Sequence, residues 1–235
     1  MDLKLTKERM ANFWEYGKLR LLAALLIALA AFYALFMVTR PRVAPGKRFD
    51  IIHGGVYLEE GLAAWSDELL NGVLTDTQKQ VNMEGLSLDD YDAYSAQMVL
   101  TGRLVAQDGD VFIIPYSVYM ALGRGDNLVN LEEPIPGDPA GESVLDKLTL
   151  PEGMDPEACR LMVTATGSDG NEVITQEICG LNAAKLQGLM EIGVVPNNYV
   201  ICIPDYKGKD MDNVVRFLNW LLTEKVEYHE IAKVE

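Results

Sequence analysis

The longest apolar run of the chain lies near its N-terminus. Residues 21–38 read LLAALLIALAAFYALFMV, which is 18 consecutive residues without a charge. At about 1.5 Å per residue, a helix of this length spans roughly 27 Å, close to the hydrocarbon thickness of a bilayer. Neither Gly nor Pro interrupts the run, and Ala and Leu favour a helix. The pattern predicts a transmembrane helix over residues 21–39, within one long helix from residue 3.

A cleaved signal peptide is the competing interpretation of this run. The stretch before it is 20 residues long, and the run exceeds the roughly 7–15 apolar residues of a signal peptide. The small residues Val43 and Ala44 lie between Arg42 and Pro45, a poor context for cleavage. No cysteine precedes Cys159, so a lipid-modified N-terminal cysteine is not expected. We therefore expect an uncleaved signal anchor.

Further along the chain, apolar segments of strand length alternate with segments of helical spacing. Strands are predicted at residues 49–53, 80–84 and 110–115. Predicted helices lie between them and after them, and the last runs from Ser117, as its N-cap, to about Arg124. The first helix has the stripe Leu58, Leu62, Trp65 and Leu69; the second, beginning at Asp89 or Asp90, has the inward stripe Tyr91, Tyr94, Met98, Gly102 and Val105. This β-α-β-α-β-α order predicts a mostly parallel sheet flanked by helices on both faces.

The second half of the chain is less regular. Residues 132–157 are rich in Pro, Gly and Asp and predict a long loop, either a crossing between lobes or a mobile lid. A hairpin is predicted over residues 160–165 and 172–178, then a helix over 182–192, a buried strand over 199–204 and an amphipathic helix over 210–222. The predicted layout is a basic N-terminus (1–20), the membrane helix (21–39), a linker (40–48) and an α/β domain (49–235).

Charge is distributed unevenly along the chain. Residues 1–48 hold nine basic and three acidic groups, a net charge of +6, whereas the other 187 residues hold 11 basic and 32 acidic groups, a net charge of −21. A domain of that charge repels nucleic acid and anionic lipid, so we expect it to bind neither. An ordinary, well-hydrated surface is the simplest interpretation of the acidic residues.

The flanks of the membrane helix give its expected orientation. Five basic residues lie on the N-terminal side and four on the C-terminal side, so the positive-inside rule decides little. A long domain is translocated largely regardless of its charge. We therefore expect a single-pass protein of the cell membrane with a cytoplasmic N-terminus and an extracytoplasmic domain.

Three cysteines are too few for a disulfide framework, and their spacing is not that of metal ligands. A three-residue loop at residues 168–170 would place Cys159 directly opposite Cys179 in the predicted hairpin. A cross-strand disulfide and two buried thiols are both compatible with that register. Cys202, in an apolar strand, is expected in the core.

Six segments carry a resemblance to a known family: residues 90–94 (DYDAY), 104–110 (LVAQDGD), 111–115 (VFIIP), 122–131 (LGRGDNLVNL), 200–204 (VICIP) and 213–221 (NVVRFLNWL). They resemble extracellular solute-binding proteins, and more narrowly the small membrane-anchored, solute-binding-like proteins of Firmicutes. The resemblance covers about half of the predicted domain. It implies a type 2 periplasmic-binding fold, a binding or sensing role without catalysis, and a small solute or a membrane transporter component as partner.

Two features depart from that family. The membrane helix at Leu21–Val38 takes the place of the usual lipidated cysteine, and the domain is considerably shorter than a complete two-lobed binding protein of this family. The resemblance therefore implies that the second lobe is reduced. Because a cleft closing between two lobes supplies ligand affinity, the alternative is an interaction or scaffold protein that keeps the fold without a working pocket.

Ligands of open parallel sheets bind at the carboxyl ends of the strands. Together with the resemblance, this rule predicts a ligand site made of the six residues that follow the first three strands: His53, Gly54, Gly55, Glu84, Tyr116 and Ser117. The glycines would let a ligand approach backbone N–H groups, Ser117 lies at a helix N-terminus that could bind an anion, and Tyr116 could stack on a ring.

Signatures of enzymes and of metal sites are absent from the sequence. His53 and His229 are the only histidines, and there is no G-x-S-x-G, P-loop or G-x-G-x-x-G motif. The acidic residues at 89–92 lack the Gly and Glu of a calcium-binding loop. We expect no catalytic residues, no metal and no cofactor.

Overall fold

The computed structural model describes residues 18–39, 44–56, 58–86, 93–125, 127–166, 171–206 and 208–228. It divides the chain into two compact units, residues 1–42 and 43–235. In the first unit, helix α2 covers Lys18–Thr39. No helix in the described part of the chain was found to be both long enough and apolar enough to cross a membrane. The membrane span predicted at residues 21–39 stays a prediction.

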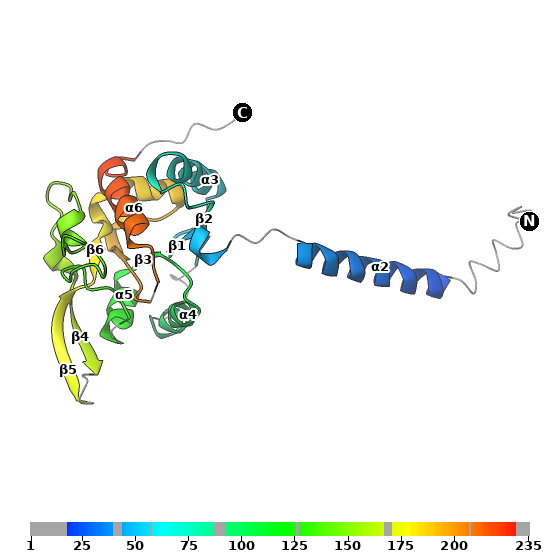
Figure 1. Ribbon diagram of the computed structural model, residues 1–235, viewed down its shortest axis with the longest axis horizontal. Coiled ribbons are helices and arrows are strands. Elements are labelled where there is room, and N and C mark those ends of the chain that lie inside the picture. The colour runs from blue at the N-terminus through cyan, green and yellow to red at the C-terminus, as the bar shows by residue number, and fades with distance from the viewer. Residues whose placement is uncertain are drawn as a thin grey trace, which may run out of the picture. The chain divides into compact units, whose positions relative to one another are not determined.

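The second unit is a mixed α/β domain (Figure 1). Its strands are β1 (Arg48–His53), β2 (Gln80–Gly85), β3 (Val111–Pro115), β4 (Arg160–Thr166), β5 (Glu172–Ile178), β6 (Gly180–Asn182) and β7 (Tyr199–Cys202). Its α-helices are α3 (Glu59–Glu68), α4 (Ala93–Val105), α5 (Tyr116–Leu122) and α6 (Met211–Glu224). Shorter turns of 3₁₀-helix lie at Pro45–Lys47, Gly123–Gly125, Leu145–Lys147, Pro156–Cys159, Ala183–Lys185, Gln187–Ile192 and Pro196–Asn198, and a π-helical turn at Leu69–Val73 extends α3.

The main sheet has five strands in the order β2-β1-β3-β7-β6. Strand β1 pairs in parallel with β2 and β3, while β7 is antiparallel to both β3 and β6. Four of the five strands therefore run in one direction and β7 runs against them. The predicted mostly parallel sheet is confirmed.

Alternate side chains of the strands enter two cores, one on each face of the sheet. Phe49 and Ile51 pack with Trp65 of α3 and Phe217 of α6, whereas Ile52 packs on the other face among residues of α4 and α5. Figure 1 shows α3 and α6 on one side of the sheet and α4 and α5 on the other. The prediction of helices on both faces is therefore confirmed.

Helix α6 shows how the sequence produces one of these packing surfaces. Asp210 caps it, because its carboxylate accepts a hydrogen bond from the backbone N–H of Asn213 at 3.2 Å. The apolar stripe then places Val214, Phe217, Leu218 and Leu221 in the core, each at most 1% exposed. An amphipathic helix predicted over residues 210–222 is thus confirmed as Met211–Glu224.

A buried polar network, which we call the Glu191 network, fastens α3 to the end of α6. The Glu191 carboxylate accepts hydrogen bonds from the Trp65 indole at 2.7 Å and the Lys225 ammonium at 3.1 Å. Lys225 also contacts Glu68, which accepts a hydrogen bond from the Trp220 indole at 2.9 Å. The two indole rings meet edge to face with centroids 4.9 Å apart. Glu191 is only 5% exposed, so its charge depends on these partners.

The hairpin β4–β5 forms a separate two-stranded sheet that extends away from the main sheet (Figure 1). Arg160 pairs with Ile178, a register that continues to Cys159 opposite Cys179. This is the predicted register. Leu161 and Val163 are buried, whereas Met162 and Ile174 are 62% and 61% exposed. The turn at residues 167–170 lies outside the described residues.

Three local predictions are wrong. The predicted inward stripe of α4 faces solvent, since Tyr94 is 69%, Met98 61% and Val105 82% exposed, while the buried residues are Ala96, Leu100 and Leu104. Ser117 does not cap α5, which begins one residue earlier, after Pro115, without a side-chain cap. The helix predicted over residues 182–192 is instead two separate 3₁₀-helices, Ala183–Lys185 and Gln187–Ile192, preceded by the unpredicted strand β6. Residues 87–92, with the predicted helix start, lie outside the described residues.

The long segment over residues 132–157 is held by its own hydrogen bonds. Pro134 bridges to Ser143, and Ile135 N–H donates to the carbonyl of Glu142 at 2.9 Å. Asn219 of α6 accepts from the backbone of Thr149 at 2.9 Å and donates to the carbonyl of Lys147, also at 2.9 Å. The segment thus packs against α6 as a folded part of the domain.

Candidate functional site

The residues predicted as a ligand site lie at the carboxyl edge of the parallel strands, as expected from their positions. Gly54 donates to the carbonyl of Ile113 at 2.8 Å and accepts a hydrogen bond from the Tyr199 hydroxyl at 2.9 Å. A Cβ on Gly55 would lie 2.4 Å from the carbonyl oxygen of Gly193, so Gly55 permits a close approach of two backbone segments. These glycines therefore pack the chain against itself.

The other predicted residues lie on β2 and at the start of α5. Glu84 forms an ion pair with Arg103 of α4. Tyr116 is 37% exposed and Ser117 is also exposed. None of the six predicted residues lines the large cavity described below. Their role in ligand binding stays a prediction.

His53 is the most unusual of the six. It is fully buried, and neither ring nitrogen has a hydrogen-bond partner among the described residues. Burial lowers the pKa of the imidazole from 6.5 to about 4, because the cationic form cannot be solvated there. A neutral, enclosed imidazole follows from this environment.

A cavity of about 730 Å³ lies at the opposite edge of the sheet. Because Phe112 of β3 pairs with Cys202 of β7, the chain after Cys202 emerges beside the start of β3, at the amino edge of the parallel strands. There Leu128 bridges to Pro204 and brings the segment 128–136 alongside 205–211. The lining residues are Leu128, Val129, Asn130, Glu133, Pro134, Ile135, Pro136, Val144, Thr175, Glu177, Asp205, Tyr206, Gly208, Lys209 and Met211.

Two of the lining residues, Tyr206 and Lys209, are fastened to the start of β3. The Tyr206 hydroxyl donates to the Asp110 carboxylate at 3.0 Å, and the Lys209 ammonium donates to the backbone carbonyls of Asp110, at 3.1 Å, and Pro204. Lys209 also lies over the Tyr206 ring, 4.3 Å from its centroid. These contacts fix the position of the segment 205–211 on the sheet.

Burial changes the acidity of all three groups. It lowers the pKa of Lys209 to about 7, although nearby Asp110 opposes that change. It raises the pKa of the Tyr206 phenol, and the Asp110 carboxylate adds to that effect. Burial also raises the pKa of Asp110, against hydrogen bonds from the Asp50 backbone and Tyr206. The ionic states of this part of the site thus depend on its low solvation.

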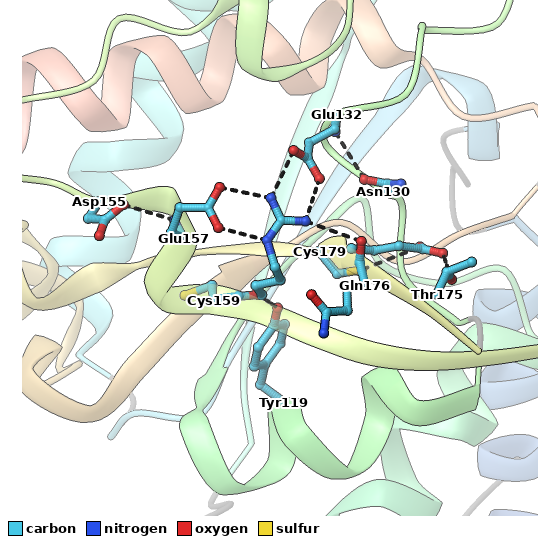
Figure 2. A network of polar contacts seen from close by, with 11 residues as sticks. Tyr119, Asn130, Glu132, Asp155, Glu157, Cys159, Thr175, Gln176 and Cys179 are labelled. Carbon is cyan, nitrogen blue, oxygen red and sulfur yellow. Dashed lines mark hydrogen bonds and ion pairs between the residues drawn. The ribbon is translucent and has the colours of Figure 1, made fainter.

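Across the cavity, an arginine clamp holds the segment near residue 132 to the hairpin. Arg160 donates to both oxygens of Glu132, each at 3.0 Å, and to both oxygens of Glu157 at 2.7 and 2.8 Å. Its fifth N–H group reaches the carbonyl of Gln176 at 3.1 Å. Figure 2 shows the carboxylates of Glu132 and Glu157 in this network of contacts. All five donors are therefore used within the protein.

The three cysteines are buried thiols that form no disulfide. The disulfide that the hairpin register allowed between Cys159 and Cys179 is not formed, and the alternative of buried thiols describes the structure. Burial raises the pKa of Cys159 to about 11, which leaves little reactive thiolate at neutral pH. In Figure 2 both residues lie beside the arginine clamp, and the Tyr119 hydroxyl donates to the Cys159 carbonyl at 2.5 Å.

The cavity presents both apolar and charged side chains to a ligand. In the described part of the chain, no group of three or more His, Cys, Asp or Glu residues is placed to hold a metal ion. The long segment at 132–157 was the one sequence signal that pointed to this side of the molecule. Lys209 and Tyr206 lie in a short connection between β7 and α6, which carries no recognisable motif.

No protein-family model, no curated protein and no solved structure matches the chain. The resemblance to solute-binding proteins therefore depends on the sequence motifs quoted above.

Proposed function

We propose that the chain is a membrane-anchored, non-catalytic binding module, related to extracellular solute-binding proteins, that holds a small solute in the cavity at the amino edge of its sheet. The cavity carries this proposal. Its volume of about 730 Å³ is within the roughly 300–1,000 Å³ of small-molecule sites. Its walls combine apolar residues such as Ile135 and Met211 with a few polar groups, among them Asn130 and Lys209, as such sites do.

A cavity-filling substitution tests this function. Thr175 is exposed on strand β5 and lines the cavity, so Thr175→Trp places an indole in it on a strand that tolerates aromatic residues. Solutes from a screen of amino acids, sugars, short peptides and amines should raise the melting temperature of the full-length chain in detergent. We expect such a stabilisation to disappear in Thr175→Trp.

The matched control is Thr164→Trp, which places the same side chain on the exposed face of strand β4, away from the cavity. This variant should retain the stabilisation by solutes. The proposal fails if no solute stabilises the wild-type chain, or if both tryptophan variants respond to the solute like the wild type.

The anchoring part of the proposal is supported by the uncharged run Leu21–Val38 and by the helix that contains it. Apolar side chains of this helix are exposed, with Ile27 at 70% and Phe32 at 69%. Exposed apolar side chains suit a helix surrounded by lipid. We propose that the domain lies outside the cytoplasm, because long domains translocate largely regardless of charge.

We expect the wild-type chain to stay in the membrane pellet after alkaline carbonate extraction. Arginine near the centre of a membrane helix disfavours insertion by about 2.5–3.5 kcal/mol. The double variant Leu26→Arg and Leu29→Arg should therefore move most of the protein to the soluble fraction. The control variant Leu26→Val and Leu29→Val should remain in the pellet. Equal extraction of wild type and arginine variant would contradict the anchor.

An interaction or scaffold protein is the second candidate, and the exposed stripe of α4 favours it. Tyr94, Met98 and Val105 present apolar surface on a helix whose one charged residue is Arg103. Depletion of charge is typical of the centre of protein interfaces. A membrane transporter component would be the partner. Under this function, Met98→Lys would abolish copurification with that partner, and solutes would leave the melting temperature unchanged.

A further inference from the structure

We infer that the ligand of the cavity is a small organic cation, an amine or guanidine attached to an apolar body. This inference rests on the proposed function, because it specifies the ligand of the same site. It follows from the balance of charged groups in the cavity, from their contacts, and from the apolar residues beside them.

The described residues that line the cavity include more anionic than cationic groups. Among them, Glu133, Glu177 and Asp205 contribute carboxylates, and Lys209 contributes an amino group. The surrounding domain has the same sign, since residues 49–235 have far more acidic than basic groups. An acidic, partly enclosed site attracts cations and raises their local concentration.

The acidic and basic groups of the cavity also differ in their contacts with the rest of the protein. The Lys209 ammonium is already engaged with two backbone carbonyls and with the Tyr206 ring. In contrast, Glu133 and Asp205 are exposed, and no hydrogen bond or ion pair joins their carboxylates to other residues in the described ranges. Asp205 acts on Lys209 through its charge alone. The cavity therefore offers two carboxylates that can accept hydrogen bonds from a ligand, while the Lys209 amino group is already engaged within the protein.

The apolar residues of the cavity define the rest of the ligand. Val129, Ile135 and Met211 are partly buried residues packed on the core, and they also line the cavity. Burying an apolar ligand group against them contributes about 25 cal/mol per Å². A bare metal ion gains nothing from such surface, whereas an amine with an aliphatic ring uses both kinds of group.

Three ligands of the same shape and different charge test the inference: cyclohexylamine, cyclohexanol and cyclohexanecarboxylate. Their dissociation constants for the full-length chain in a non-ionic detergent can be measured by saturation-transfer NMR at pH 7.5, with Thr175→Trp as the blank for binding to detergent. We expect the amine to bind about tenfold more tightly than the alcohol, since one such charge-assisted hydrogen bond contributes roughly 1.4 kcal/mol. We expect the carboxylate to bind more weakly than the alcohol.

Two variants assign the effect to the carboxylates. Glu133→Gln and Asp205→Asn keep the shape of each side chain and should each weaken binding of the amine about three- to tenfold, without changing binding of the alcohol. Glu152→Gln removes one negative charge from an exposed residue outside the cavity and should leave the amine affinity within about twofold of the wild type.

The outcomes separate the ligand class from the site itself. If the alcohol or the carboxylate binds as tightly as the amine, or if Glu152→Gln weakens the amine as much as the cavity variants do, the cationic ligand is refuted while the cavity remains a binding site. If none of the three ligands binds better to the wild type than to Thr175→Trp, the cationic ligand is likewise refuted, and the proposed function fails with it only if the solute screen described above also finds no stabilising solute.

Discussion

Replacing Glu191 by alanine is expected to lower the free energy of unfolding of the domain by about 3–5 kcal/mol, the usual effect of removing one partner from a buried ion pair. The substitution leaves the Trp65 indole N–H without its 2.7 Å acceptor and removes the more deeply buried of the two carboxylates that contact Lys225. Denaturation in urea, followed by near-ultraviolet circular dichroism, measures the change.

Glu68→Ala is the matched control for this prediction. Glu68 contacts the same ammonium and a second indole, but its side chain is 46% exposed. Water can replace much of the stabilisation that the Glu68 carboxylate provides. We therefore expect Glu68→Ala to lower the free energy of unfolding by about 1 kcal/mol or less. If the two substitutions lowered the free energy of unfolding equally, the burial of Glu191 would not account for its contribution to stability.

The domain is also expected to lose stability as the pH falls from about 6.5 to about 4 because of His53. Above this window the imidazole is neutral in both states. Within it the unfolded chain binds a proton near the ordinary pKa of 6.5, while the folded chain does not until its pKa of about 4. Stability therefore falls with falling pH, by a total of roughly 3 kcal/mol.

His53→Leu isolates this contribution from the carboxylates that titrate in the same range. The free energy of unfolding of wild type and variant should be compared at pH 7.5 and at pH 4.5. The variant should lose less stability between the two pH values, by about 2–3 kcal/mol. If both proteins lose the same amount, His53 must reach solvent or a partner in the folded state.

Much of the sheet could be predicted from sequence, because its strands are short apolar runs with helical segments between them. Residues 49–53 and 110–115 were predicted to within one residue of β1 and β3. The hairpin register followed from the loop length alone. These features depend on residues close together in the chain, where hydrophobic periodicity is most informative.

The orientation of α4 could not be obtained in this way. The helix has one apolar stripe through Tyr94 and Met98 and another through Ala96, Leu100 and Leu104, and both repeat every four residues. The larger side chains suggested the wrong face. The structure buries the second stripe, and Gln97 donates to the carbonyl of Ala121 in α5 at 3.1 Å, which fixes the rotation of the helix. Tertiary contacts decided between two equally periodic faces.

Strand β6 was missed because it is short and begins with glycine. Gly180 normally signals a break in a strand. Here a Cβ at this position would lie 2.6 Å from the Val200 side chain and 3.0 Å from the Tyr119 ring, so glycine allows three elements to approach closely. A sequence pattern contains no information about such a distance.

The candidate site was missed for a related reason. The rule that ligands bind at the carboxyl edge of parallel strands directed attention to His53 and its neighbours. The cavity is instead made by two segments, 128–136 and 205–211, that are distant in the chain and meet through the bridge between Leu128 and Pro204. Only the tertiary fold brings Glu133 and Asp205 to one cavity.

The position of β7 in the sheet has a consequence for biosynthesis. It is the last strand in the described part of the chain but lies in the interior of the sheet, between β3 and β6. While the nascent chain is shorter than residue 199, β3 has an unpaired edge of apolar residues, and such edges readily pair with other chains. Helix α6, which closes one core, follows later still. The domain therefore completes its fold only after β7 and α6 have been synthesised, and chains that terminate before Tyr199 should aggregate instead of forming a smaller stable domain.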